Sequence, residues 1–485
     1  MTISSFGILF IPIAFWIFLF LPRYLVPLMV LASVFSAASV VDFSLGDSVF
    51  GIQPFYFAGV LVAIRTVPLL LDFSQLQFYL EPGAFGVVKS LLRFWKWAVL
   101  SSFLFPTIFK GVQVTDPRNA VEDSIAAVAL ERETRPLHWS LENLGQAGYL
   151  TLSVIALLYV MYSARDEDQS RRSLSALRIS VAIVSIIAIL QSVAVWRGWP
   201  FPYDFLNSNP AYAQNFSAMF GDIARVSSTF TEASYAGGFM AAASLGLLAA
   251  RFYGDATSVY MLFLALIGLL LTTATTGYAA FALGVVILLV YLLRSSLRQG
   301  SSRRQLRTIL FVTISVIVAV VVIVAVVPVF REVLIVSTLE KGDSLSFAVR
   351  LSLDAYSLRI LSDTYGLGAG LGSYRPSSLG AALLGNVGIV GAFLFFAFII
   401  KLFSQLLAAS RRLGDTNFAM VAWMLSGLLI AEGLALPDIS WPPLWGILIA
   451  ATALLASQPE MVTEPGAALE DPSVGGELPG DPAMA

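Results

Sequence analysis

The sequence predicts an all-α integral membrane protein with about 12–14 transmembrane helices and two long external loops that contain short interfacial helices. Three observations lead to this fold class. The 485-residue chain is 58% hydrophobic and only 12% charged, whereas a soluble domain carries roughly 25% charged residues. Its apolar residues gather in runs of about 17–25, the length that crosses about 30 Å of hydrocarbon. Polar residues concentrate between those runs, chiefly in the loops 197–234 and 329–384.

Apolar runs of spanning length recur about 13 times along the chain. The first two are short and are separated only by Pro22 and Arg23, so the N-terminal count is open by one or two. The runs do not pair into inverted halves, which disfavours a typical transporter. The expected spans are 6–22, 24–41, 50–71, 94–109, 147–163, 178–196, 235–252, 257–273, 277–293, 308–328, 385–407, 417–435 and 443–457.

Lysine and arginine residues set the expected orientation, because loops rich in them stay on the cytoplasmic side. Basic residues crowd the loops after the fifth, ninth and eleventh spans, and these three loops fall on one side. The loops at about 110–146, 197–234 and 329–384 are therefore expected outside. In this interpretation residues 1–457 form one polytopic membrane domain. Residues 458–485, rich in Pro, Gly, Ala and acidic residues, are expected to be a disordered cytoplasmic tail.

Composition also excludes several classes of function. The net charge is −2, so no basic field favours a nucleic-acid partner. The chain has no cysteine, which excludes disulfides, thiolate zinc sites and a cysteine nucleophile. His138 is the only histidine, which excludes a histidine-based metal site. Composition thus leaves no thiolate or multi-histidine metal site, and we also expect no cofactor.

The first long loop ends in a motif suited to binding an anion. A short surface helix is expected near Ala211–Phe220, followed by an extended segment that begins at Arg225. Ser234 or Thr231 is expected to cap the next helix, whose free N–H groups and positive dipole end then face outward and favour a phosphate or carboxylate. Arg225 and Glu232 flank that helix start. The plainer alternative is an Arg225–Glu232 ion pair that only pins the loop.

The second long loop is expected to hold an amphipathic helix at the membrane interface. Arg350 lies one turn before Asp354, which can hold its guanidinium in place, whereas Arg359 projects to the opposite side. A solvated helix face with an i,i+4 pair is the plainer alternative. The expected apolar face consists of Phe347, Leu351, Ala355, Leu358 and Leu361.

Alternating glycines at Gly366–Gly372 follow this helix. They predict a tight backbone path beside a ligand or a neighbouring helix rather than a nucleotide site. Tyr374 and Arg375 come next, and Ser377–Ser378 could cap the helix that leads into the eleventh span.

Arg65 and His138 are expected to have only packing roles, Arg65 by snorkelling from the inner end of its span. Gln191 and the Thr272–Thr276 run are expected to form inter-helix hydrogen bonds. Glu432 with Asp438 is expected to form a polar contact or part of a pathway.

Four motifs resemble the O-antigen polymerase and O-antigen ligase family of bacterial envelope enzymes. They are R-V-S-S-T-F-T-E-A-S-Y-A-G-G-F at Arg225–Phe239, L-L-T-T-A-T-T-G at Leu270–Gly277, V-R-L-S-L-D-A-Y at Val349–Tyr356 with T-Y-G-L-G-A-G at Thr364–Gly370, and L-L-G-N-V-G-I-V-G at Leu383–Gly391. The resemblance covers roughly residues 210–400 and the many-helix layout. Three departures stand out: Ala233 replaces a usual proline, the second motif lacks its arginine, and Ser377 occupies the register of the histidine that ligases carry.

The resemblance implies a GT-C-like, metal-independent glycosyltransferase of the bacterial inner (cytoplasmic) membrane. Its function would be polymerisation of O-antigen or exopolysaccharide repeats on the periplasmic face. Donor and acceptor would both be glycans on undecaprenyl diphosphate, and chain-length regulator or export proteins are further implied partners.

Within that chemistry, guanidinium groups can hold the diphosphate and stabilise the charge of the leaving group. We expect Arg225 and Arg350 in this role, with Arg375 as third choice. Glu232 is the expected base and Asp354 the second choice. The expected substrate-binding residues are Arg375, Asp354, Ser234, Tyr374 and Ser377.

Three other classes stay open at this point. A ligase of the same family would transfer finished polysaccharide to another acceptor. A transporter of polysaccharide or lipid-linked sugar would place its charges at mid-membrane. A non-catalytic scaffold in an export complex would tolerate loss of the arginines.

Overall fold

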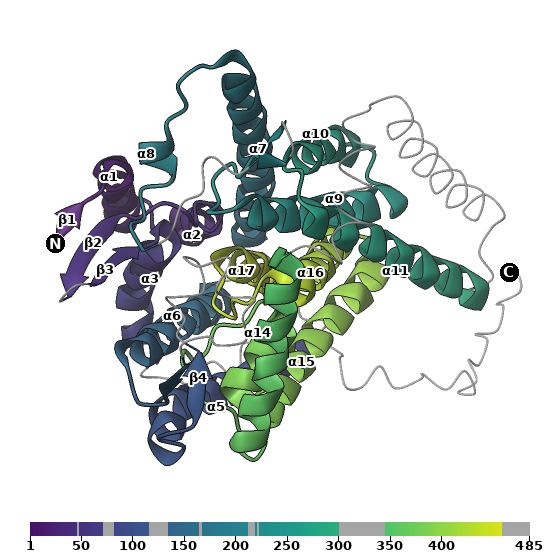
Figure 1. Cartoon of the computed structure of the whole chain (residues 1–485). Helices are drawn as coiled ribbons and strands as arrows, with labels where there is room; N and C mark the ends of the chain where they lie inside the picture. The colour runs from purple at the N-terminus through teal and green to yellow at the C-terminus, as the bar shows by residue number, and fades with distance from the viewer. Residues whose placement is uncertain are drawn as a thin grey trace, which may run out of the picture.

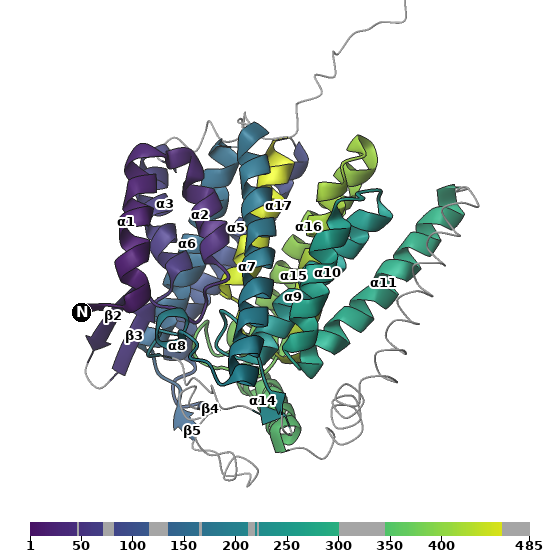
Figure 2. The ribbon, with the colours of Figure 1, turned by 90° about the horizontal axis from the view of Figure 1, so that it is seen from above.

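The computed structural model describes residues 1–45, 48–70, 82–115, 134–163, 167–211, 219–220, 223–299 and 345–457. The expected span 308–328 and the expected tail 458–485 lie outside the described residues. The described chain is a bundle of roughly aligned helices with short strands and loops gathered at one end (Figures 1 and 2).

Six helices in the described part of the chain are long and apolar enough to cross a membrane. They are α6 (Leu141–Ser163), α7 (Glu167–Arg197), α9 (Ala233–Phe252), α11 (Thr275–Gln299), α15 (Leu379–Leu413) and α16 (Thr416–Ala435). Shorter apolar helices accompany them: α1 (Ser5–Phe20), α2 (Leu25–Ala32), α3 (Pro54–Leu70), α10 (Ser258–Leu271) and α17 (Pro442–Ala456). The protein is therefore a multi-pass, all-α membrane protein.

Helix α9 lies at the centre of the bundle and is almost entirely buried. It packs against α10, α11 and α16. Small residues allow these helices to come close, as is usual where membrane helices associate. A Cβ added at Gly237 would lie 2.6 Å from Ala274 in the break between α10 and α11, and one at Gly246 would lie 2.5 Å from the carbonyl oxygen of Met420 in α16.

The region around the second expected span differs from the prediction. Residues 24–41 do not form one membrane-spanning helix: a 3-10 turn at Pro22–Tyr24 and the short α2 are followed by irregular chain. That chain is held by loops distant in sequence, since Ala37 donates to Thr229 and Asn209 donates to Ala37 through the backbone. It leads into a small antiparallel sheet of β1 (Thr2–Ile3), β2 (Val41–Leu45) and β3 (Ser48–Ile52).

The described parts of the three expected external loops lie together at one end of the bundle (Figure 2). They contain the antiparallel pair β4 (Gln113–Thr115) and β5 (Thr134–Pro136), the short helix α8 (Tyr203–Leu206), the pair β6 (Met219–Phe220) and β7 (Ile223–Ala224), and α14 (Leu345–Asp363). The loop after α5 (Pro82–Ile108) is shorter than predicted because α6 already begins at Leu141. The surface helix expected near 211–220 does not include Met219–Phe220, and 212–218 are outside the described residues.

Helix α14 forms in the second long loop as predicted. Leu353 and Ile360 are buried, whereas Leu351 and Leu358 are 61% and 58% exposed. Leu351 and Leu358 of the expected apolar stripe are therefore free to contact lipid, as expected for a helix at the membrane interface. In a membrane protein such a stripe can lie against lipid, so apolar side chains do not by themselves mark the protein core.

Candidate functional site

The segment from Arg225 to Thr231 enters the bundle in a fixed conformation. The segment expected to be extended from Arg225 onward is irregular at 225–227, and the chain turns at Ser228, whose φ is 54°. The Ser228 N–H donates to Gln191 Oε1 at 2.7 Å, and its hydroxyl donates to the carbonyl oxygen of Val184 at 2.8 Å. Thr229 Oγ1 donates to the carbonyl oxygen of Val34 at 2.6 Å. These bonds fix the chain just after Arg225.

Helix α9 begins immediately after this turn, at Ala233. The predicted cap at Ser234 or Thr231 is wrong. Glu232 occupies the N-cap position, and its side chain makes no capping hydrogen bond. The Ser234 hydroxyl instead donates to Glu232 Oε2 at 3.0 Å. The first N–H groups of α9 therefore receive no side-chain cap, which favours an anion at this end.

Arg225 is half-buried beside this helix start. Its Nε atom is buried and has no hydrogen-bond partner. Burial lowers the pKa of Arg225, the nearby Glu232 carboxylate raises it, and the positive charge of Arg350 lowers it again. Tyr278 in α11 also lies close enough to act on this guanidinium. No ion pair joins Arg225 to Glu232 among the described residues, so the plainer alternative of an ion pair is not observed.

Arg350 approaches the same place from α14. Within the described part of the chain, its guanidinium makes no ion pair and no hydrogen bond. Arg359, nine residues later, is 67% exposed and pairs with Asp363 at 3.8 Å. The structure thus brings Arg225, Glu232 and Arg350 together and leaves Arg359 on the other side of α14, as predicted from the helical spacing.

The prediction that Asp354 holds the Arg350 guanidinium is wrong. Its Oδ1 atom accepts hydrogen bonds from Ser377 N at 2.8 Å, Ser377 Oγ at 3.0 Å and Ser378 N at 3.1 Å. Backbone N–H groups before a helix need acceptors, and the carboxylate satisfies two of them. Ser378 then caps α15, as expected, by accepting from Ala381 N. Asp354 and Ser377 therefore join the arginine helix to α15.

The glycine-rich segment is a tight backbone path between helices, as its spacing predicted. Gly366, Gly368, Gly370 and Gly372 all have φ between 83° and 100°. An added Cβ would lie 2.6 Å from the carbonyl oxygen of Asn386 at Gly368, and 2.7 Å from backbone oxygens of α5 and α6 at Gly370 and Gly372. L-residues with a side chain avoid such φ values, so only glycine fits here.

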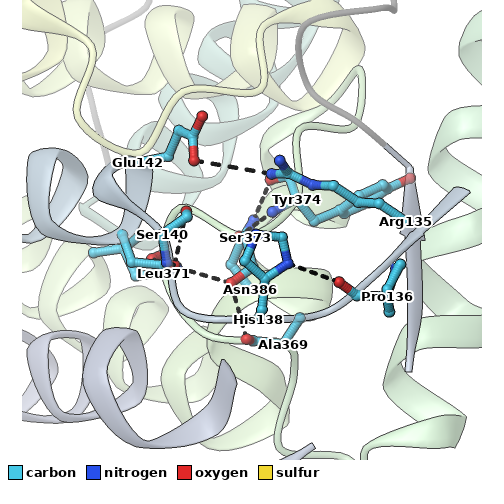
Figure 3. Close-up of polar contacts among 11 residues, drawn as sticks. Arg135, Pro136, His138, Ser140, Glu142, Ala369, Leu371, Ser373, Tyr374 and Asn386 are labelled. Carbon is cyan, nitrogen blue, oxygen red and sulfur yellow. Dashed lines mark hydrogen bonds and ion pairs between the residues drawn. The ribbon is translucent and has the colours of Figure 1, made fainter. Parts of the chain in front are cut away.

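Side chains around this segment tie it to the beginning of α6 and to α15 (Figure 3). Asn143 Nδ2 donates to the carbonyl oxygen of Leu371 and to Ser373 Oγ, both at 2.8 Å. Asn386 Oδ1 accepts from Tyr374 N at 3.0 Å. Tyr374 is buried, and its hydroxyl donates to the carbonyl oxygen of Leu353 in α14. Tyr374, predicted as substrate-binding, therefore packs α14 onto the bundle.

His138 lies beside the same segment but is exposed, with Nδ1 2.9 Å from the carbonyl oxygen of Pro136 (Figure 3). Arg65 donates to the carbonyl oxygen of Phe18 and lies over its ring. Both positions agree with the packing roles expected from the sequence. The Thr272–Thr276 run instead breaks the helix, and Thr273 has a φ of 47°. Thr272 and Thr273 donate within the break, to Leu269 and Thr272, rather than to another helix as predicted.

Arg375 lies near the first turn of α9. A side-chain hydrogen bond joins it to Tyr235, and its charge acts on Asp438 in the turn between α16 and α17. Burial raises the pKa of Asp438, while Arg375 and the Ser440 N–H lower it. Sequence reasoning missed Tyr235 and Tyr278. Tyr235 lies inside the arginine motif and Tyr278 directly follows the helix-break motif, and these positions were the available signals.

Comparison with known proteins gives no further guidance: no protein-family model matches the chain, and no curated protein matches it.

Proposed function

We propose that the protein polymerises undecaprenyl-diphosphate-linked oligosaccharide repeats on the outer face of a bacterial inner membrane. The reaction is a glycosyl transfer in which arginines hold the carrier diphosphate. The single observation that carries the proposal is the approach of Arg225 and Arg350 at the start of α9 without any ion-pair partner in the described chain.

Two neighbouring guanidinium groups that no carboxylate pairs at ion-pair distance are unfavourable in the free protein, even though the charge of Glu232 offsets part of the cost for Arg225. Burial of Arg225 removes water from its charge, and Arg350 adds repulsion. Such groups normally pair with an acid or an anionic ligand. A diphosphate supplies several oxygens that two guanidinium groups can bind in fork geometry. The arrangement therefore suits a polyanion better than a single carboxylate.

The α9 start adds a second source of positive potential. Its first N–H groups have no side-chain cap, and the helix dipole is positive at this end. Charge that develops on the leaving diphosphate would be stabilised by fixed groups that need no reorganisation. This supports departure of a diphosphate without invoking any further group.

Glu232 supports the acid–base part of the proposal. It is exposed at the helix start, next to Arg225, and Ser234 donates to it. In the proposed reaction Glu232 removes the proton of the acceptor hydroxyl while the arginines retain the diphosphate. Asp354, the second-choice base, is already occupied by Ser377 and Ser378.

Polymerisation is favoured over ligation by the position where family ligases carry a histidine. Ser377 stands there, and its N–H and hydroxyl both donate to Asp354, which ties it to packing. A deletion strain tests the choice directly. Loss of the polymerase leaves single repeats on the carrier at the outer leaflet, whereas loss of a ligase leaves long chains on the carrier and loss of a transporter leaves repeats at the inner leaflet.

Substitutions of arginine test the site itself. Arg225→Ala and Arg350→Ala should each abolish long polymer while single lipid-linked repeats and protein levels stay normal. Arg359→Ala is the matched control, because this arginine lies on the same helix as Arg350 but is exposed and paired with Asp363. Full-length polymer in both test variants would refute the proposal.

A further inference from the structure

Helix α5 carries three cations on one exposed face. Lys89, Arg93 and Lys96 are exposed, whereas Val88 and Phe94 beside them are buried. Spacings of four and three residues align the three side chains in one row along the helix. Within the described part of the chain, none of these cations pairs with a carboxylate. Charges on a membrane helix normally face water or a partner, so this row indicates a binding surface for an anion.

Contacts with α15 show which end of α5 carries the row. Trp97 Nε1 donates to the carbonyl oxygen of Val387 at 2.8 Å, and the ring centroids of Phe94 and Phe395 are 5.2 Å apart. The two helices therefore run antiparallel, and the row extends along α15 toward its basic last turn. Basic helix ends favour the cytoplasmic side, so the row is expected at the cytoplasmic leaflet.

Lys401 of α15 adds a fourth cation to this surface. A Cβ added at Gly86 would lie 2.3 Å from Lys401 Nζ, so the ammonium group lies against α5, one turn before Lys89. Lys401 also has no carboxylate partner among the described residues. Lys89, Arg93, Lys96 and Lys401 together form the α5 basic patch. Like charges repel one another, and a bound anion offsets that repulsion.

The exposed face of α5 becomes apolar beyond the α5 basic patch. Leu100, Phe103 and Leu104 are 49%, 42% and 44% exposed and continue the row toward the outer end of the helix. One row is thus cationic at its cytoplasmic end and apolar toward the middle of the bilayer. An anionic phospholipid has the same order of groups, with a charged headgroup at the leaflet surface and hydrocarbon chains below it. A free phosphate ion would leave the apolar part of the row unmatched.

We propose that the α5 basic patch binds the headgroup of an anionic phospholipid in the cytoplasmic leaflet. The phosphate oxygens accept hydrogen bonds from the ammonium and guanidinium groups of the patch, and the acyl chains lie along Leu100, Phe103 and Leu104. Several cations gathered at one place favour a headgroup with a net negative charge over a zwitterionic one. The binding uses none of the residues of the candidate functional site and is independent of the proposed function.

Native mass spectrometry of the whole protein tests this lipid site. The probe is phosphatidylglycerol, with zwitterionic phosphatidylcholine as the reference lipid, and the wild type should prefer phosphatidylglycerol. Each basic residue near an anionic headgroup contributes about fivefold in affinity. The triple variant Lys89→Gln, Arg93→Gln, Lys96→Gln should therefore bind phosphatidylglycerol roughly 100-fold more weakly and lose most of its preference. Equal wild-type affinity for the two lipids, or undiminished binding by the triple variant, overturns the proposal.

A charge-matched control separates a defined site from general attraction to a basic surface. Arg171→Gln, Arg251→Gln and Arg294→Gln together remove three exposed cations from α7, α9 and α11, and this variant should bind phosphatidylglycerol as the wild type does. An equal loss of affinity in the control also overturns the site. Lys89→Arg with Lys96→Arg keeps the charges and should keep the affinity, and a loss there contradicts an electrostatic site. Should the triple variant fail to fold, Lys89→Gln and Lys96→Gln alone should each bind about fivefold more weakly, and unchanged affinity in both overturns the site.

Discussion

The Arg350→Ala substitution tests whether Arg350 binds a ligand or supports the fold. The Arg350 guanidinium makes no ion pair or hydrogen bond within the described chain, and its charge repels that of Arg225. Repulsion between two like charges in this setting is a destabilising contribution that falls with distance and with solvent screening. Removal of Arg350 relieves that repulsion and sacrifices only some packing of its aliphatic stem. The free energy of unfolding should therefore change by less than about 1 kcal/mol or increase.

The transfer activity of Arg350→Ala should fall, although its stability is kept or increased. Loss of one fixed electrostatic donor to a leaving group typically lowers the rate by about 100- to 1,000-fold. The assay is extension of lipid-linked repeats by purified protein in lipid, with chain length read on gels and thermal unfolding measured on the same samples. Arg359→Ala removes an ion pair with Asp363 in which the arginine side chain is 67% exposed. This variant should keep its activity and lose at most about 1 kcal/mol of unfolding free energy.

Two results would refute this reasoning. Arg350→Ala with the activity of Arg359→Ala would show that the guanidinium does not act on the reacting groups. A loss of unfolding free energy above about 2 kcal/mol would show that Arg350 supports the fold through contacts comparable to a buried pair.

Three further predictions concern how the site is held. Gly368→Ala places a Cβ at φ 83° and 2.6 Å from a backbone oxygen, so it should lower the melting temperature strongly, whereas Gly380→Ala, with nothing within 4 Å, should not. Asp354→Ala removes the acceptor of three hydrogen bonds before α15 and should cost about 2–3 kcal/mol in chemical unfolding; an unchanged midpoint would contradict the structure. Gln191→Leu leaves the buried Ser228 N–H unpaired and should cost about 1–3 kcal/mol, with faster amide hydrogen exchange at Ser228; unaltered exchange would argue against the anchor.

Much of the helical layout could be predicted from sequence because the apolar runs end at residues that stop or cap helices. The spans expected at 235–252, 417–435 and 443–457 correspond to Ala233–Phe252, Thr416–Ala435 and Pro442–Ala456. The prediction of a span at 24–41 was wrong because apolar composition does not reveal backbone hydrogen bonds to distant loops. Ala37 pairs with Thr229 and Asn209, and no local pattern reveals that contact.

The candidate site was predictable in its residue types but not in its pairings. The spacing of Arg350 and Asp354 suggested an i,i+4 contact. The Asp354 carboxylate instead accepts hydrogen bonds from the backbone N–H groups of Ser377 and Ser378, which precede α15 and need acceptors. Arg375 bonds to Tyr235 across a long stretch of sequence, so only the fold could reveal it.

Affinity for undecaprenyl diphosphate tests the central claim most directly. It should be measured on purified protein in lipid for the wild type, for Arg225→Ala, for Arg350→Ala and for the Arg359→Ala control. Each lost charge-assisted bond is worth about 1.5–3 kcal/mol, so the two test variants should bind about 10- to 100-fold more weakly. The control should bind as the wild type does. Equal affinity in all four proteins would contradict the account.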